Sequence, residues 1–196
     1  MENNKRVIHI APSVYIVLAL SILLLPLQWV TAWVIAATIH EAGHLIVSLL
    51  CGAKIRGISI TPGGAVIETD MLTPWKRLLA SISGPAAGCC LLPFAKYIPL
   101  CATFAFVHSI FNLLPIGDLD GAEILRTVLR MVCNREQASQ ISHVTDIAVR
   151  AVLISISLIV AWKLSWSFAG ILSVLLLVRL KKKPLQTKHF IGTICI

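Results

Sequence analysis

The sequence predicts an all-α polytopic membrane protein that crosses the bilayer six times and carries a small membrane-associated β-hairpin. Of its 196 residues, 57% are hydrophobic and only 13% are charged. With a mean hydropathy of +0.86, this composition is too apolar for a soluble domain of this size. We expect residues 1–196 to form one domain. The six apolar segments are placed at residues 14–27, 30–50, 78–95, 100–114, 147–162 and 168–180.

The formal net charge of +8 raises the question of a nucleic-acid partner. The basic residues are scattered through short loops and lack the aromatic interleaving typical of nucleic-acid-binding surfaces, so we expect no such partner. They act instead as topology signals. With the N-terminus in the cytosol, only Lys96 and Lys163 of the 17 basic residues face outward, as the positive-inside bias requires. Both termini are therefore predicted to be cytosolic.

The first two apolar segments are predicted to form a tight helical hairpin. Residues 1–6 are polar, and no small-residue cleavage site follows them, so we expect no removable signal peptide. Pro26 and Trp29 mark the turn between the two segments. The second segment has about 20 apolar residues, enough to span roughly 30 Å of hydrocarbon.

After Leu50 the pattern changes from helical to alternating. Residues 58–60 and 65–68 alternate on either side of the Thr-Pro-Gly-Gly sequence at 61–64, which predicts two short strands joined by a turn. The exposed edges of such a hairpin could accept an extended peptide by strand addition. A surface hairpin without a ligand is the alternative.

The remaining segments differ in character. In the third, Gly84 and Gly88 allow another helix to approach closely, and Pro85 favours a local bend. The fourth ends in the Pro-, Gly- and Asp-rich stretch 115–121, whose irregular backbone is tolerated at membrane depth where protein buries it. Residues 122–140 form an amphipathic pattern that we expect to lie along the membrane surface. The fifth and sixth segments are apolar.

The second segment contains the candidate catalytic residues His40, Glu41 and His44. Residues four apart share a helix face, so both histidines can direct a ring nitrogen to one ion about 2.0–2.1 Å away. Glu41 lies beside that ion without having to bind it. This arrangement is typical of zinc metalloproteases, in which the glutamate takes a proton from the attacking water. An ionisable residue inside an apolar helix costs about 2.5–3.5 kcal/mol, which also favours a functional role.

Three alternatives are weaker. A histidine pair that only hydrogen-bonds within a bundle leaves Glu41 unexplained. A zinc transporter would need further acidic or histidine ligands along a crossing path, yet the first, third, fifth and sixth segments contain no acidic residue. A catalytically inactive relative that acts as a membrane-protein binding partner would not need the base.

A catalytic zinc needs a third protein ligand, and the end of the fourth segment offers Asp118 and Asp120. Positions two apart in a helical turn point about 200° from each other, so only one of them should reach the ion. Asp120 followed by Glu123 also fits an N-cap with its capping-box partner for a helix starting near Gly121, worth about 1 kcal/mol. From the residues alone, both aspartates are candidates.

Two motifs taken together resemble those of a known family. The His-Glu-Ala-Gly-His sequence at 40–44 lies in one apolar helix, and Asn112-x-x-Pro115-x-x-x-x-Asp120-Gly121 lies at the end of a later one. This pair resembles the site-2 proteases, which are intramembrane zinc metalloproteases with a core of six transmembrane helices.

The resemblance implies a role for each matching residue. His40, His44 and Asp120 bind one Zn²⁺ per chain, Glu41 is the catalytic base, and Asn112 helps to position the substrate or the oxyanion. The implied function is regulated intramembrane proteolysis of a membrane-spanning or membrane-tethered protein. The expected surroundings are the lipid bilayer and a membrane regulatory protein.

Within the family, the chain looks most like the sporulation branch, which cleaves an inactive sigma-factor precursor in the bacterial cell membrane. The similar features are the Pro62-Gly63-Gly64 turn, Ser83-Gly84-Pro85, and His9 and Pro12 before the first segment. Gly63 and Gly64 would then guide the substrate. The chain differs from the branch in three ways. We expect no room for the cytosolic nucleotide-sensing domain that the branch carries, and Ala122 replaces the usual second glycine. The third difference is His108, which we interpret as a packing or hydrogen-bonding residue.

Overall fold

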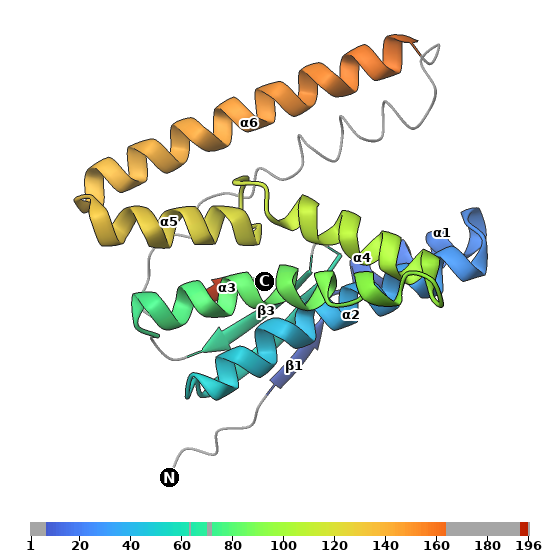
Figure 1. Ribbon diagram of the computed structural model, residues 1–196, viewed down its shortest axis with the longest axis horizontal. Coiled ribbons are helices and arrows are strands. Elements are labelled where there is room, and N and C mark those ends of the chain that lie inside the picture. Colours follow the sequence, from blue (N-terminus) through green and yellow to red (C-terminus); the bar gives the residue numbers. More distant parts are fainter. Residues whose placement is uncertain (1–6, 63, 70–71, 164–192, 196) are drawn as a thin grey trace. The chain divides into compact units, whose positions relative to one another are not determined.

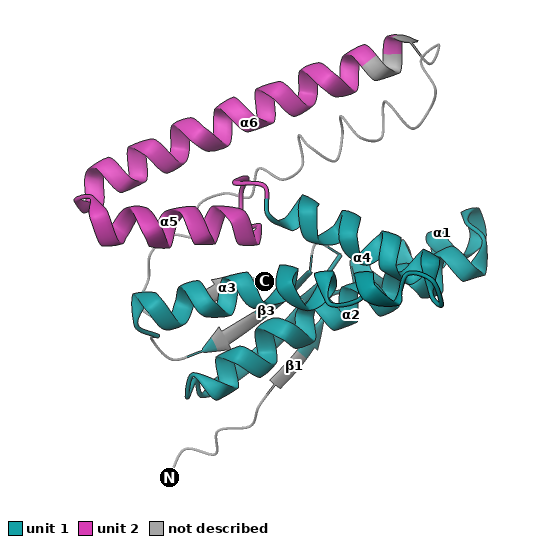
Figure 2. Cartoon of the chain, viewed as in Figure 1, with its two compact units in different colours: residues 1–113, 190–196 teal, residues 114–189 magenta. Residues whose placement is uncertain are grey.

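The computed structural model describes residues 7–62, 64–69, 72–163 and 193–195, which form mostly helices and one small sheet (Figure 1). The chain divides into two compact units (Figure 2). The first contains residues 1–113 and 190–196, and the second contains residues 114–189. The single domain expected from the sequence stays a prediction.

The first unit contains the first four predicted segments, which are confirmed as helices. A proline lies in the first turn of α1, α3 and α4, where its missing N–H costs nothing. The third segment ends in a short 3₁₀ helix, η1. The bounds are α1 Pro12–Leu24, α2 Leu27–Leu50, α3 Pro74–Cys89, η1 Leu92–Phe94 and α4 Pro99–Asn112.

Among the described residues, three helical stretches are long and apolar enough to cross a membrane, namely 27–50, 74–94 and 135–159. The helices α1 and α4 are apolar but shorter. No residue of α1 is buried, as expected for a helix that faces lipid. These stretches indicate a multi-pass membrane protein. The predicted sixth segment, 168–180, lies outside the described residues, and the orientation in the membrane stays a prediction.

Small residues allow α2, α3 and α4 to pack closely. A Cβ added to Gly43 of α2 would lie 2.6 Å from the Ser83 carbonyl oxygen of α3, and one added to Gly88 of α3 would overlap the Ser109 hydroxyl of α4. The close approach predicted for Gly88 is therefore confirmed. Trp29 of α2 packs edge-on against Phe104 of α4, with 6.2 Å between ring centroids.

A lysine joins the end of α2 to the start of α3. Lys76 Nζ donates a hydrogen bond to the Cys51 carbonyl oxygen over 2.7 Å. Cys51 is the C-cap of α2, where a cation stabilises the unpaired carbonyls and the negative end of the helix dipole. The contact fixes where α3 begins alongside the helix that carries the histidines.

The predicted hairpin is confirmed, but it belongs to a larger sheet of order β1-β2-β3-β4. The strand β2 pairs antiparallel with β3, β1 pairs parallel with β2, and β4 pairs antiparallel with β3. The expectation of exposed hairpin edges is wrong, because strands of the same chain satisfy the backbone groups on both sides. The bounds are β1 Val7–Ile10, β2 Ile55–Thr61, β3 Gly64–Thr69 and β4 Thr193–Cys195.

The second unit contains α5 (Asp120–Val132) and α6 (Arg135–Lys163). The prediction of one amphipathic segment over 122–140 is wrong in its extent, because α5 ends at Val132. The fifth segment, predicted at 147–162, is part of a helix that already begins at Arg135. The chain breaks at Cys133–Asn134, where Asn134 Oδ1 accepts a hydrogen bond from the Gln137 amide over 2.8 Å. This side-chain bond gives α6 a new N-terminus, and the helix continues without interruption into the apolar part.

Candidate metal centre

His40 and His44 lie on the buried face of α2, with exposed fractions of 1% and 0%. Their Nε2 atoms are 3.2 Å apart. Two nitrogens bound tetrahedrally to zinc at about 2.05 Å would be about 3.3 Å apart. The spacing predicted from positions i and i+4 is therefore realised with the ring nitrogens already converged.

A backbone carbonyl of α3 orients the His44 ring. His44 Nδ1 lies 2.7 Å from the Ala80 carbonyl oxygen, which can only accept, so Nδ1 carries the proton. In the neutral ring, Nε2 then presents its lone pair toward His40. Such a bond behind a metal-binding histidine fixes its tautomer and raises its basicity.

A glycine provides the space for that ring. A Cβ added to Gly84 of α3 would overlap His44 Nε2 and would lie 2.5 Å from its two neighbouring ring carbons. The sequence pattern indicates only close helix packing at Gly84. In the structure, the group that comes close to Gly84 is the imidazole of His44. No pattern in the sequence links these two residues. No sequence signal could have indicated the Ala80 carbonyl, because every residue has one.

The two aspartates differ sharply in environment. Asp120 has an exposed fraction of 2%, whereas Asp118 is exposed. The capping role considered for Asp120 is wrong, because α5 begins one residue earlier than expected. Its N-cap is Leu119, which has extended backbone and no side-chain cap, and the Leu119 carbonyl accepts from the amides of Ala122 and Glu123 over 3.0 and 3.2 Å.

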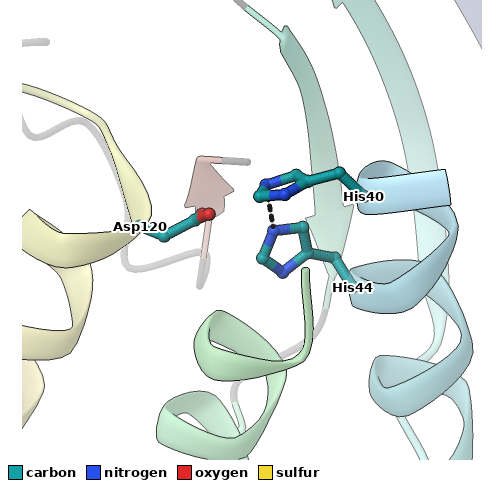
Figure 3. A group of neighbouring side chains, drawn as sticks. All are labelled: His40, His44 and Asp120. Atoms are coloured by element: carbon teal, nitrogen blue, oxygen red, sulfur yellow. Dashed lines mark hydrogen bonds between the residues drawn. The ribbon is translucent and has the colours of Figure 1, made fainter. Parts of the chain in front are cut away.

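His40, His44 and Asp120 form a buried group that can hold a metal ion (Figure 3). Each offers one ligand atom, and these atoms all lie within 4.8 Å of one another. Two imidazoles and a carboxylate are a ligand set that zinc accepts at catalytic sites. Asp120 is thus the aspartate that joins the pair.

The other predicted site residues lie on α2, at the end of α4 and in the hairpin. Glu41 is half-buried on α2. Asn112, the last residue of α4, donates from Nδ2 to the His108 carbonyl oxygen over 3.1 Å, and the His108 ring packs edge-on against His40 with centroids 4.7 Å apart. Gly64 has a φ of 126°, and Gly63 lies outside the described residues.

No family model matches the chain. It is 26% identical over 125 residues to a candidate zinc metalloprotease of Synechocystis and 28% identical over 131 residues to a zinc metalloprotease of Methanocaldococcus jannaschii. These matches cover 55% and 58% of the chain, and they span 33% and 39% of the two relatives.

The fold is that of a solved structure. A site-2 protease from Methanocaldococcus jannaschii superposes with a TM-score of 0.62 at 19% sequence identity, and the match covers 96% of each chain. The protein therefore has a site-2 protease fold with a buried His-His-Asp group. It is a distant relative of zinc metalloproteases.

The different environments of the two aspartates lead to a prediction. We expect Asp120→Ala to lose bound zinc, because it removes one of three ligands, and Asp118→Ala to retain stoichiometric zinc, because its carboxylate faces solvent. Metal content of the two purified variants is the measurement. Retention of zinc by Asp120→Ala together with its loss in Asp118→Ala would reverse the assignment.

The contact between Gly84 and His44 leads to a second prediction. Gly84→Ala should lower zinc affinity at least 10-fold, because its methyl group takes the place of the buried ring. Gly88→Ala is the matched control on the same helix, since its methyl group meets the Ser109 hydroxyl and no metal ligand. Zinc titration of both variants provides the test, and equal affinities would show that His44 can move away from Gly84 at no cost.

Proposed function

We propose that the protein is an intramembrane zinc endopeptidase that cleaves a membrane-spanning or membrane-tethered protein. The observation that carries the proposal is the buried group His40, His44 and Asp120. Its two histidines lie with Glu41 on an apolar helix long enough to cross a membrane. Ionisable side chains within a membrane-spanning helix indicate a functional site by default. The site-2 protease fold and the distant zinc metalloprotease relatives support the same function.

The ligands and the base have separate roles. His40, His44 and Asp120 would hold the zinc ion, which when bound polarises the scissile carbonyl and makes water a stronger nucleophile. Glu41 takes the proton of the attacking water and passes it to the leaving amine, since a carboxylate can act first as base and then as acid. Its place one residue after His40 lets it serve the reaction without ligating the ion.

Asn112 is proposed to orient the substrate carbonyl or to stabilise the oxyanion. One amide proton is used in the bond from Nδ2 to the His108 carbonyl, which holds the side chain in one orientation. The second amide proton is then available to donate to a developing negative charge.

The hairpin turn at Gly63 and Gly64 is proposed to guide the substrate. The φ of 126° at Gly64 is accessible to glycine and costly for other residues, so the turn depends on this residue. Since β1 and β4 occupy the edges of β2 and β3, an incoming strand would pair with an outer strand of the sheet or displace one of the two.

The substrate class follows from the site's position in an apolar helix, since only a membrane-associated chain would reach it. We propose regulated intramembrane proteolysis in a bacterial cell membrane, with a sigma-factor precursor as the first substrate to test and a membrane protein as regulator. The features that support this choice are Pro62-Gly63-Gly64 and Ser83-Gly84-Pro85.

The role of Glu41 leads to a direct test. Co-expression with single-span or membrane-anchored substrates should show cleavage by the wild type, a loss of about 100- to 10,000-fold in Glu41→Gln, and unchanged zinc content. Glu136→Gln, at an exposed position of α6, is the control and should cleave normally. Full activity of Glu41→Gln would sink the mechanism, and absence of cleavage by a zinc-loaded wild type would favour an inactive relative.

The proposed role of the turn has its own test. Replacing Gly63 and Gly64 together with valine should slow cleavage while zinc content stays at the wild-type value, because the change affects substrate guidance and not the metal group. Ala65→Val is the control, since β-branched residues suit an extended strand. If the double variant cleaves at the wild-type rate, the hairpin has no part in substrate binding.

A further inference from the structure

We propose that Arg126 and Asp146 hold Gly117 from its two sides and thereby position Asp120 for the metal. We call the three residues the Gly117 clamp. The inference rests on the proposed function only in taking Asp120 as a zinc ligand. It assigns a positioning role to two charged residues, on α5 and α6, that the catalytic mechanism does not use.

Both backbone polar groups of Gly117 are bound by side chains from elsewhere in the second unit. The Gly117 amide donates to Asp146 Oδ1 over 2.7 Å. Its carbonyl oxygen accepts from Arg126 Nη1 over 2.9 Å. With a φ of 56°, Gly117 adopts the left-handed backbone that favours glycine. The loop therefore depends on a particular residue and on two charged partners, 9 and 29 residues further along.

Each partner is itself held in place. Arg150 donates to the two oxygens of Asp146 from Nε and Nη2, over 2.8 and 2.9 Å. Arg126 pairs with Glu123 Oε2 at 3.2 Å. Paired guanidinium–carboxylate bonds restrict both groups to one geometry, so the clamp presents a fixed acceptor and a fixed donor to the loop.

Gly117 lies three residues before the metal-binding carboxylate. Ile116, on one side of Gly117, and Leu119, on the other, are both buried, and the Leu119 amide donates to the Ile116 carbonyl over 3.1 Å. Asp120 is the first residue of α5, so any shift of this short turn moves its carboxylate directly. Groups that orient metal ligands typically change metal affinity about 10- to 100-fold when removed.

A role confined to α6 does not explain the arrangement. Asp146 and Arg150 are four residues apart and could form an ordinary helical ion pair. Such a pair would not need a bond to the Gly117 amide. It would also not explain why a second charged residue, on another helix, binds the carbonyl of the same glycine. Charged groups within a stretch apolar enough to span a membrane also call for a function.

The test uses the full chain, purified in detergent, with Zn²⁺ as the probe and a competing chromophoric chelator to report affinity. Arg126→Gln should weaken zinc binding about 10- to 100-fold. Arg130→Gln is the matched control, because Arg130 lies one turn further along α5 and is exposed, and its affinity should equal that of the wild type. The absorption spectrum of the Co²⁺-loaded protein should change only in Arg126→Gln.

The role of Asp146 in the clamp is tested by a conservative substitution and a more severe one. Asp146→Asn keeps an oxygen that can accept from Gly117, whereas Asp146→Ala removes it, so the loss of affinity should be larger for alanine. In an Asp120→Ala background, Arg126→Gln should have no further effect on residual zinc binding, because its action passes through Asp120.

Two results would overturn the clamp. One is a lower unfolding temperature of Arg126→Gln and Asp146→Asn with zinc affinity and Co²⁺ spectrum unchanged, which would make the clamp purely structural. The other is an equal effect of Arg126→Gln with and without Asp120. Neither depends on proteolysis, so a wild type that binds zinc and cleaves nothing would contradict the proposed function and leave the clamp intact.

Discussion

The ring of His44 occupies the space next to Gly84 where any other residue would place its side chain. This contact imposes a condition on the first unit, because α3 must approach α2 closely enough for a backbone carbonyl to reach the ring. Gly43 of α2 allows this approach, because it lies against the Ser83 backbone of α3. Gly88 allows a similarly close approach of α3 to Ser109 of α4. A buried Nδ1–H without an acceptor would cost about 1–3 kcal/mol, and the Ala80 carbonyl removes that cost.

The carboxylate of Asp120 is positioned by a different kind of interaction. Helix packing with small residues holds the imidazoles, whereas charged side chains hold the loop before Asp120 through the backbone amide and carbonyl of Gly117. Asp120 also lies in the first turn of α5, where the unpaired amides and the helix dipole favour a negative charge.

Two differences from the expectations have clear causes. The Asn134 cap that starts α6 depends on a single side-chain bond, and such a bond is easily overlooked where hydrophobic periodicity continues on both sides. The sheet is wider than a hairpin because β1 and β4 come from distant parts of the sequence. Pairing between strands that far apart leaves no local signal, since each strand alone has only its alternation.

The sequence by itself determined the class of protein, the first four apolar helices, and His40, Glu41 and His44, because hydropathy and the spacing of i and i+4 are properties of single segments. It left two aspartates open and indicated only helix packing at Gly84. The tertiary structure decided between the aspartates by burying Asp120 and exposing Asp118, and it placed Gly84 at His44 and Asp146 at Gly117. Those relations join residues about 30 to 40 positions apart, and they depend on how helices and loops pack, which no local pattern encodes.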